Sequence, residues 1–374
     1  AEGACTKAAG QSSHAEGSQT VSEGTGSHAE GSITLAHGIY SHAEGTKTVS
    51  YGISSHAEGE GTDDIAILID SIIPGKSISV GLVGPQQNTA EGQGSHVEGS
   101  ANRAIGDYSH AEGVACIAQG IASHAEGLGT KALGIASHAE GDPTIAEGDF
   151  SHAEGSGTLA FGIASHSEGI NSQSIGEFSH AEGSSTQAIG QGAHSEGLGS
   201  LAAGDGSHAE GIGSGATGSA SHAEGFGTNA GECTAHSEGF TTLAYGVASH
   251  SEGIMTGATG LASHAEGFNT YAFGPHSHAE GYFSYAYGQQ SHAEGNSTSA
   301  YGDCSHAEGI NTITGGTGSH AGGMDASADQ WCQWSRSCGY FSSGNLAQTS
   351  EFYLKGHSEA GQTGWLCLTF DDSH

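Results

Sequence analysis

Histidine and glutamate recur together at a fixed interval along this chain, and they are the residues best suited to chemistry. Twenty-one of the 25 histidines, His14 to His56 and His96 to His320, are spaced 14 residues apart, with one gap between 56 and 96. Twenty of them lie in Ser/Ala-His-Ala/Ser/Val-Glu-Gly, and in the last copy Gly322 replaces the glutamate. An imidazole two residues before a carboxylate could exchange protons, form an ion pair or ligate a transition metal.

The first interpretation of these pairs is a structural ladder. Residues two apart on a strand share a face, and stacked copies bring like residues to within about 4.8 Å of one another. A file of carboxylates would repel, and the adjacent imidazoles can relieve that repulsion as hydrogen-bond donors or as cations. We therefore predict a His-Glu ladder in which the imidazoles and carboxylates satisfy one another. The residues that represent it are His110, Glu112, His124, Glu126, His138, Glu140, His152, Glu154, His180, Glu182, His208, Glu210, His264, Glu266, His292 and Glu294.

A metal column is the less favoured interpretation of the same residues. A His-x-Glu strand could bind Zn or Ni. A motif repeated twenty times is more often structural, so we expect no metal and no cofactor. A calcium-binding roll is not indicated, because Gly-Gly-x-Gly-x-Asp is absent, and the second threonine that an ice-binding strand would need is alanine here.

Catalysis is not predicted. Acidic pairs and Ser, His and Asp combinations arise by chance in so acidic and serine-rich a chain, and nothing distinguishes one site from the repeat background. Two enzymatic alternatives stay open, namely C-terminal autoproteolysis and a distal glycan depolymerase activity.

A second motif between the histidine motifs indicates the elements that position them. It reads Thr-x-Ala-x-Gly, as in residues 130–134, 158–162 and 270–274. Each 14-residue unit is therefore predicted to hold two short strands and two turns, with alanine on one face and the variable or His and Glu residues on the other. Glycine is expected to close each strand with a positive φ. The sequence predicts an all-β parallel solenoid whose twenty steps would span roughly 95 Å at the spacing between strands.

Composition agrees with a thin core. The chain has 374 residues, 66 of them Gly, and only 34% are hydrophobic, so a large aliphatic interior is excluded. The net charge of -34 argues against nucleic acid and anionic membranes as partners. No apolar run is long enough to span a bilayer, no secretory leader is evident, and the seven cysteines form no CxxC pair. Because Ala1-Glu2-Gly3 is the tail of another copy, we expect a longer parent polypeptide.

Two segments depart from the repeat. Residues 60–92 carry 26 extra residues, with an apolar run at 65–69 and a Pro74-Gly75 turn signal, and they predict a β-hairpin extruded from one coil; a receptor-binding knob is the alternative. The repeat is predicted to cover 1–323, and a small C-terminal β domain to begin in 324–374, where all three tryptophans lie.

The repeat resembles a known family. Its Ser-x-Ala-x-Gly pattern is similar to the head repeat of trimeric autotransporter adhesins, and the SHAEG version resembles relatives in bacteriophage tail fibres and appendages. Residues 336–341 and 347–356 resemble a segment near the C-terminal ends of phage tail proteins. The resemblance implies a left-handed parallel β-roll and a homotrimer.

The function that this resemblance implies is structural. The expected protein is a rigid fibre of a phage or virus-like tail that presents a host-recognition or assembly domain, located on the virion or outside the cell, with other virion proteins and a host receptor or glycan as partners. A bacterial trimeric adhesin head on the cell surface is the first alternative, and an enzyme-bearing appendage is the second.

Trimer contacts are expected on the SHAEG strand. Its His and Glu positions barely vary between copies, whereas the other strand varies freely, as a solvent-facing surface would. The variable strand also carries aromatic residues that could face a receptor, although stacking between coils or packing between chains is the favoured interpretation. They are Phe161, Tyr245, Tyr271, Phe273, Tyr285, Tyr287 and Tyr301.

Overall fold

The protein is described by a computed structural model that covers residues 1–61, 87–341, 345–357 and 363–371. Every regular element in these ranges is a β-strand. Within them, no helix is long and apolar enough to cross a membrane. The chain divides into two compact units, Ala1–Gly199 and Ser200–His374, and each is a parallel β-solenoid with a 14-residue repeat. The predicted all-β solenoid is confirmed.

The N-terminal unit contains the first 25 strands. They are β1 (Glu2–Ala4), β2 (Lys7–Ala8), β3 (His14–Ser18), β4 (Val21–Ser22), β5 (His28–Ser32), β6 (Leu35–Ala36), β7 (His42–Ala43), β8 (Thr48–Ser50), β9 (His56–Ala57), β10 (Asn88–Ala90), β11 (His96–Ser100), β12 (Arg103–Ala104), β13 (His110–Val114), β14 (Ile117–Ala118), β15 (His124–Leu128), β16 (Lys131–Ala132), β17 (His138–Gly141), β18 (Ile145–Ala146), β19 (His152–Ser156), β20 (Leu159–Ala160), β21 (His166–Ile170), β22 (Gln173–Ser174), β23 (His180–Ser184), β24 (Gln187–Ala188) and β25 (His194–Leu198).

The C-terminal unit contains the remaining strands of the described ranges. They are β26 (Leu201–Ala202), β27 (His208–Ile212), β28 (Gly215–Ala216), β29 (His222–Phe226), β30 (Asn229–Ala230), β31 (His236–Phe240), β32 (Leu243–Ala244), β33 (His250–Ile254), β34 (Gly257–Ala258), β35 (His264–Phe268), β36 (Tyr271–Ala272), β37 (His278–Tyr282), β38 (Tyr285–Ala286), β39 (His292–Asn296), β40 (Ser299–Ala300), β41 (His306–Ile310), β42 (Ile313–Thr314), β43 (His320–Met324), β44 (Ser327–Ala328), β45 (Trp334–Phe341), β46 (Asn345–His357) and β47 (Thr363–Asp371).

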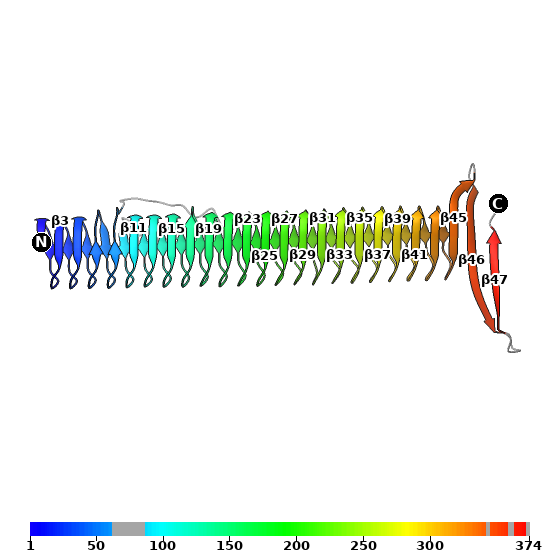
Figure 1. Ribbon diagram of the computed structural model, residues 1–374, viewed down its shortest axis with the longest axis horizontal. Helices are drawn as coiled ribbons and strands as arrows, with labels where there is room; N and C mark the ends of the chain where they lie inside the picture. The colour runs from blue at the N-terminus through cyan, green and yellow to red at the C-terminus, as the bar shows by residue number, and fades with distance from the viewer. Residues whose placement is uncertain (62–86, 342–344, 358–362, 372–374) are drawn as a thin grey trace. The chain divides into compact units, whose positions relative to one another are not determined.

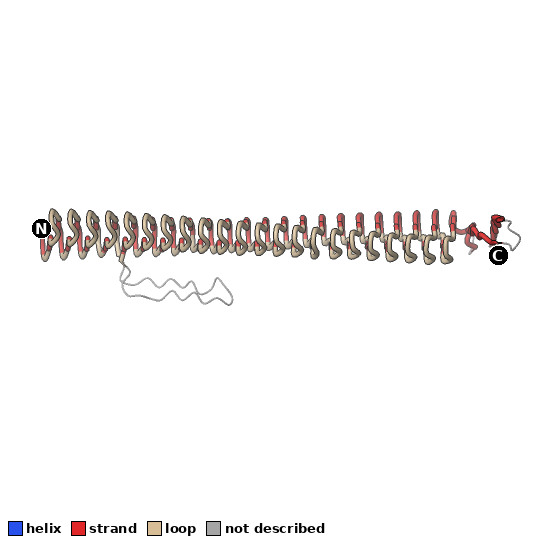
Figure 2. Tube along the Cα trace, turned by 90° about the horizontal axis from the view of Figure 1, so that it is seen from below, coloured by secondary structure: helices blue, strands red, loops and turns tan. Residues whose placement is uncertain are grey.

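Each coil contributes one strand to each of two parallel sheets (Figures 1 and 2). Most strands of the first sheet begin at the repeated histidine, and most strands of the second sheet end at the alanine of the second motif. Partners in neighbouring coils are 14 residues apart, as in His110↔His124 for the first sheet and Ile117↔Lys131 for the second. Because the solenoid strands within each unit pair in register with the next copy of themselves, like side chains form columns.

The core between the two sheets is a column of small side chains. Ala125 and Ala132 are fully buried, and so are the alanines at the same positions of most other coils. Ser123 and Thr130 fill the corners and are exposed by no more than 1%. This confirms the predicted interior of alanine with Ser and Thr at the corners.

The second outward position of the variable strand is exposed in most coils, as predicted, but the first is half-buried in most coils and buried at Val49, Lys131, Ile145 and Leu159. Lys131 is exposed by 6% and Leu159 by 1%. Burial lowers the pKa of the Lys131 ammonium group. The expectation of a wholly solvent-facing second strand therefore fails at its first outward position.

Glycine has two roles in the coil. The sequence predicted the positive φ but not the close approach of successive coils. Gly127 has the expected positive φ (114°), although its strand extends one residue further, to Leu128. Gly148 has no positive φ, and a Cβ built on it would lie 2.0 Å from the carbonyl oxygen of Gly162 in the next coil. The left-handed turn position before each histidine is often not glycine at all, as at Tyr108 (φ 58°) and Ala122 (φ 56°). Close approach of successive coils, and not turn conformation, requires the second glycine.

The insertion leaves the solenoid ladder unbroken. His56 pairs directly with His96 and Ala57 with Val97, so the coils on either side stack as if the extra residues were absent. The chain departs after Gly61 and returns at Gln87, which lie at the turn between the two strands of a coil. The predicted hairpin itself lies outside the described residues.

The solenoid pairing continues beyond residue 323. Strand β43 pairs in parallel with β45, with His320 opposite Trp334 and Met324 opposite Cys338. Strands β45, β46 and β47 then pair antiparallel, so the predicted C-terminal strands begin as an extension of the first sheet. These added strands pair with the edge of the first sheet that the last coil would otherwise expose.

Two buried asparagines link the coils that follow the insertion. The Nδ2 group of Asn102 donates to the carbonyl oxygens of Glu98 (2.5 Å) and Gly113 (2.7 Å), and its Oδ1 accepts from the amide of Cys116 (2.7 Å). Asn88 uses its Oδ1 in the same way to accept from the amide of Asn102. These bonds join adjacent coils at a corner position that Ser or Thr occupies in most other coils.

Replacing Asn102 by alanine is expected to destabilise the protein by about 3 kcal/mol. The change leaves the buried amide of Cys116 without its partner and removes the two bonds to the carbonyls of Glu98 and Gly113, and an unpaired buried polar group costs about 1–3 kcal/mol. Urea unfolding followed by circular dichroism would measure the loss. Asn296→Ala, at an exposed strand position, is the matched control and should change stability by less than about 0.5 kcal/mol. Equal effects of the two substitutions would contradict the buried asparagine ladder.

Candidate functional site

Three columns of side chains cover the outer face of the first sheet. In β29, for example, His222, Glu224 and Phe226 alternate with the buried Ala223 and with Gly225. The same alternation in the other full-length strands produces a histidine column, a glutamate column and a third column at the fifth residue. We call this surface the His/Glu face.

The imidazole rings of the histidine column stack on one another. From His28 to His194 in the N-terminal unit, successive ring centroids are 4.7–5.0 Å apart and the rings are within 14° of parallel. From His208 to His306 in the C-terminal unit, the spacing is 4.7–4.9 Å and the angle at most 12°. The spacing equals that of the backbone strands, so the stack follows directly from the registered pairing.

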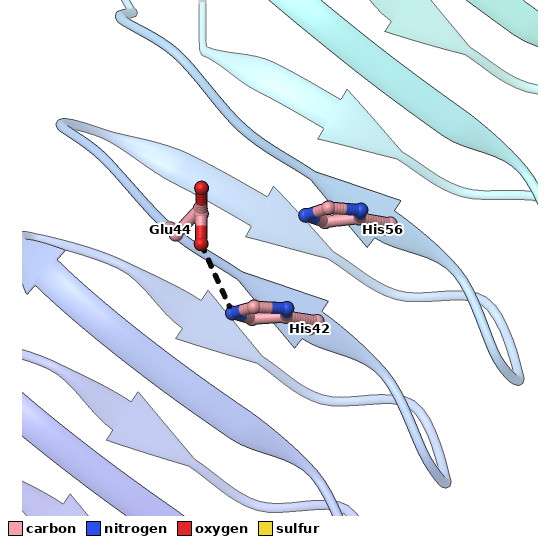
Figure 3. Close-up of side chains that lie close together, drawn as sticks. All are labelled: His42, Glu44 and His56. Atoms are coloured by element: carbon pink, nitrogen blue, oxygen red, sulfur yellow. Dashed lines mark ion pairs between the residues drawn. The ribbon is translucent and has the colours of Figure 1, made fainter.

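Each glutamate lies beside the histidine of its own strand, as Figure 3 shows for Glu44 and His42. The Nε2–Oε2 distance is 3.4 Å in that pair and lies between 3.4 and 4.0 Å in most coils. His124 and Glu126 are typical, with side chains exposed by 36% and 44%. At these distances the two groups attract each other electrostatically without a well-formed hydrogen bond.

The Nε2 atoms of most column histidines are buried and have no hydrogen-bond partner, as at His42, His124 and His250. Burial, and after it the charge of the neighbouring histidine, lowers the pKa of imidazoles such as His124 and His250, against the opposing effect of nearby glutamates. The rings of His124 and His250 are therefore neutral near pH 7, and the Nε2 atom of each offers a lone pair or an N–H group that has no hydrogen-bond partner in its own chain.

All sixteen residues predicted for the ladder lie on this face. Six of the eight pairs have a nitrogen and a carboxylate oxygen within 4.0 Å: His110–Glu112, His124–Glu126, His152–Glu154, His208–Glu210, His264–Glu266 and His292–Glu294. The structure thus brings each predicted pair to one surface. The predicted hydrogen-bond network between chains stays a prediction.

The third column was not singled out from the sequence. In the C-terminal unit it runs through Ile212, Phe226, Phe240 and Ile254, with 44–48% of each side chain exposed, and reaches Tyr282. Phe226 stacks on Phe240 with ring centroids 5.0 Å apart. Its signal in the sequence is an apolar residue four positions after each of these histidines. The column adds a continuous apolar stripe beside the glutamates.

Trp334 and Arg336 end the columns. Trp334 takes the histidine position and stacks on His320, with ring centroids 4.3 Å apart and planes 3° from parallel. Arg336 takes the glutamate position, and its guanidinium carbon lies 5.3 Å from the Trp334 ring centroid. Glu308 turns to His320, at 3.4 Å, beside Gly322, where a glutamate is missing. In the last coil, Trp334 and Arg336 thus take the places that the histidine and the glutamate occupy in the other coils.

The aromatic residues of the variable strand form stacks of their own. Phe273, Tyr287 and Tyr301 stack at 4.9 and 4.7 Å, and Tyr271 stacks on Tyr285 at 5.9 Å. Tyr245 is exposed by 45%, and Phe161 and Tyr285 are half-buried. Stacking between coils, the favoured interpretation, is confirmed in the C-terminal stacks. Because stacked rings cover one another's faces, mainly their edges are available to a ligand, and a receptor contact stays a prediction.

Comparison with known proteins adds no further assignment: no protein-family model and no curated protein matches this chain.

Proposed function

We propose that this chain is a structural fibre protein that forms a rigid support for a recognition or assembly domain. One observation carries the proposal: each coil repeats the previous one in register, with backbone bonds such as His110 N–H to the Ser123 carbonyl (2.9 Å) and His124 N–H to the Ser137 carbonyl (2.9 Å). Such a stack resists bending because every coil is bonded to its neighbours on both sheets. A stack of coils bonded in this way suits a mechanical role.

The proposed setting is a phage or virus-like tail fibre, outside the cell. The resemblance of the SHAEG repeat and of residues 336–341 and 347–356 to phage fibre proteins supports it. The net charge of -34 would keep such a fibre soluble and away from anionic surfaces.

The proposed assembly is a homotrimer in which the His/Glu face is the contact surface. Soluble monomers seldom expose long continuous apolar patches, and the column from Ile212 to Ile254 is such a patch. It lies next to the Nε2 atoms of His222, His236 and His250, which lack a hydrogen-bond partner within the chain. A second copy would cover the apolar column and offer glutamates to these nitrogens.

Light scattering on the purified chain should give three times the mass of 37.2 kDa, and electron microscopy of the same sample should show straight rods. Introducing charge at the apolar column, in Phe226→Glu with Phe240→Glu, should reduce the mass to that of one chain. The matched control is Tyr245→Glu with Phe273→Glu, which places the same charges on exposed aromatic positions of the other sheet and should stay trimeric. A monomeric native chain would contradict the trimer, and compact particles would contradict the fibre.

A further inference from the structure

We propose that the His/Glu face binds first-row transition-metal ions, each held by two histidines of successive coils and the glutamate of the first coil. Figure 3 shows one such group, in which ligand atoms of His42, Glu44 and His56 all lie within 4.8 Å of one another. The same arrangement recurs at His96, Glu98 and His110, at His166, Glu168 and His180, and at further coils. The proposal needs a single chain and does not rest on the fibre or trimer assignment.

The state of the histidine nitrogens supports ligation. The Nε2 atoms of His96, His110, His166 and His180 are buried without a hydrogen-bond partner. Leaving a buried polar atom unpaired is costly, and a bound cation would satisfy it.

The donor set selects the kind of metal. Two imidazole nitrogens and one carboxylate oxygen suit Zn, Ni, Cu or Co, whereas Mg and Ca prefer oxygen ligands alone. With Zn–N bonds of about 2.0–2.1 Å, two nitrogens across one ion can be at most about 4.2 Å apart. The rings, now 4.8 Å apart at His96 and His110, must therefore tilt toward each other. Rotation about side-chain bonds on this outer face is sufficient, and the backbone need not move.

The geometry also limits the number of ions. Each Nε2 atom can serve one ion, so an ion that uses two successive histidines excludes both from its neighbours. Twelve column histidines in the N-terminal unit and nine in the C-terminal unit allow six and four such pairs. Ions would then be about two coils apart, roughly 9.6 Å, and the negative charge of the chain would offset their mutual repulsion. The expected maximum is ten ions per chain.

Equilibrium dialysis of the full chain against ZnCl2, followed by elemental analysis, should find several ions per chain and at most ten, and dialysis against MgCl2 should find none. His96→Gln, His110→Gln, His166→Gln and His180→Gln, combined in one variant, should lose at least two zinc ions. His276→Gln is the matched control, because His276 lies at an exposed turn outside the column and should leave the count unchanged.

A second variant separates ligation from folding. Glu98→Gln with Glu168→Gln keeps the size of both side chains and the histidine stack, and should weaken zinc binding at those two sites at least tenfold in isothermal titration calorimetry. A zinc count below one per chain would overturn the proposal. So would an equal loss in His276→Gln, or zinc binding that the four histidine substitutions leave unchanged, because adventitious binding would then account for the ions.

Discussion

Replacing Gly148 by alanine is expected to destabilise the N-terminal unit by more than about 4 kcal/mol, the range of severe backbone or packing conflicts. The added Cβ would lie 2.0 Å from the carbonyl oxygen of Gly162, which is part of the backbone and cannot rotate away. The two coils would have to separate, which would weaken bonds such as Gly148 N–H to the Ala160 carbonyl (3.3 Å). Urea unfolding followed by circular dichroism would measure the effect.

Gly192→Ala is the matched control for that substitution. Gly192 has φ 62°, but a Cβ there would meet nothing within 4 Å. Alanine occupies the equivalent left-handed position at Ala122, Ala136 and Ala164 in other coils, so the cost should be about 1–2 kcal/mol. If the two substitutions destabilised the protein equally, backbone conformation would be the cause, and the proposed close approach of coils at Gly148 would be wrong.

Much of the coil could be predicted because its causes are local. The 14-residue period and the alternation around Ala125 place alanine inside and His124 and Glu126 outside, and the structure confirms both. The dual role of glycine could not be predicted, because the contact between Gly148 and Gly162 depends on how closely coils stack. A residue type alone does not distinguish a turn from a close approach.

The hydrogen bonding of the histidines could not be predicted from the sequence either. The repeat predicts that His124 and Glu126 are neighbours, but whether they form a hydrogen bond depends on tenths of an ångström in side-chain position. Nε2 of His124 and Oε2 of Glu126 are 3.8 Å apart, and Nε2 of His124 has no hydrogen-bond partner. Trp334 and Arg336 illustrate the same limit, because their place in the columns follows from pairing with His320 and Gly322 in a coil that lacks the motif.

Acidification should destabilise the protein once metal has been removed with a chelator. Burial first, and neighbouring histidines next, lower the pKa of nine column histidines below the value of 6.5 for an unfolded chain: His56, His110, His124, His152, His180, His236, His250, His292 and His320. The unfolded state therefore binds more protons than the folded state as the pH falls. The stabilisation is complete above about pH 6.5 and is lost as the pH falls through the lower folded values. Scanning calorimetry in EDTA should show a melting temperature that falls between about pH 7.5 and pH 5.5.

Whether stability falls or rises on acidification depends on the charged and titratable groups around each imidazole ring. His124 faces His138 in the next coil, which lowers its pKa, and Glu126, Glu112 and Glu140, which raise it; His320 also faces Arg336, which lowers its pKa further. Replacing the glutamates should therefore deepen the acid sensitivity, whereas a variant with His110, His124, His152 and His180 changed to glutamine should flatten it, because four of the shifted imidazoles are gone. A melting temperature that rises on acidification would mean that protonated histidines are stabilised by their glutamates, and that the column is held together by ion pairs instead of neutral stacked rings.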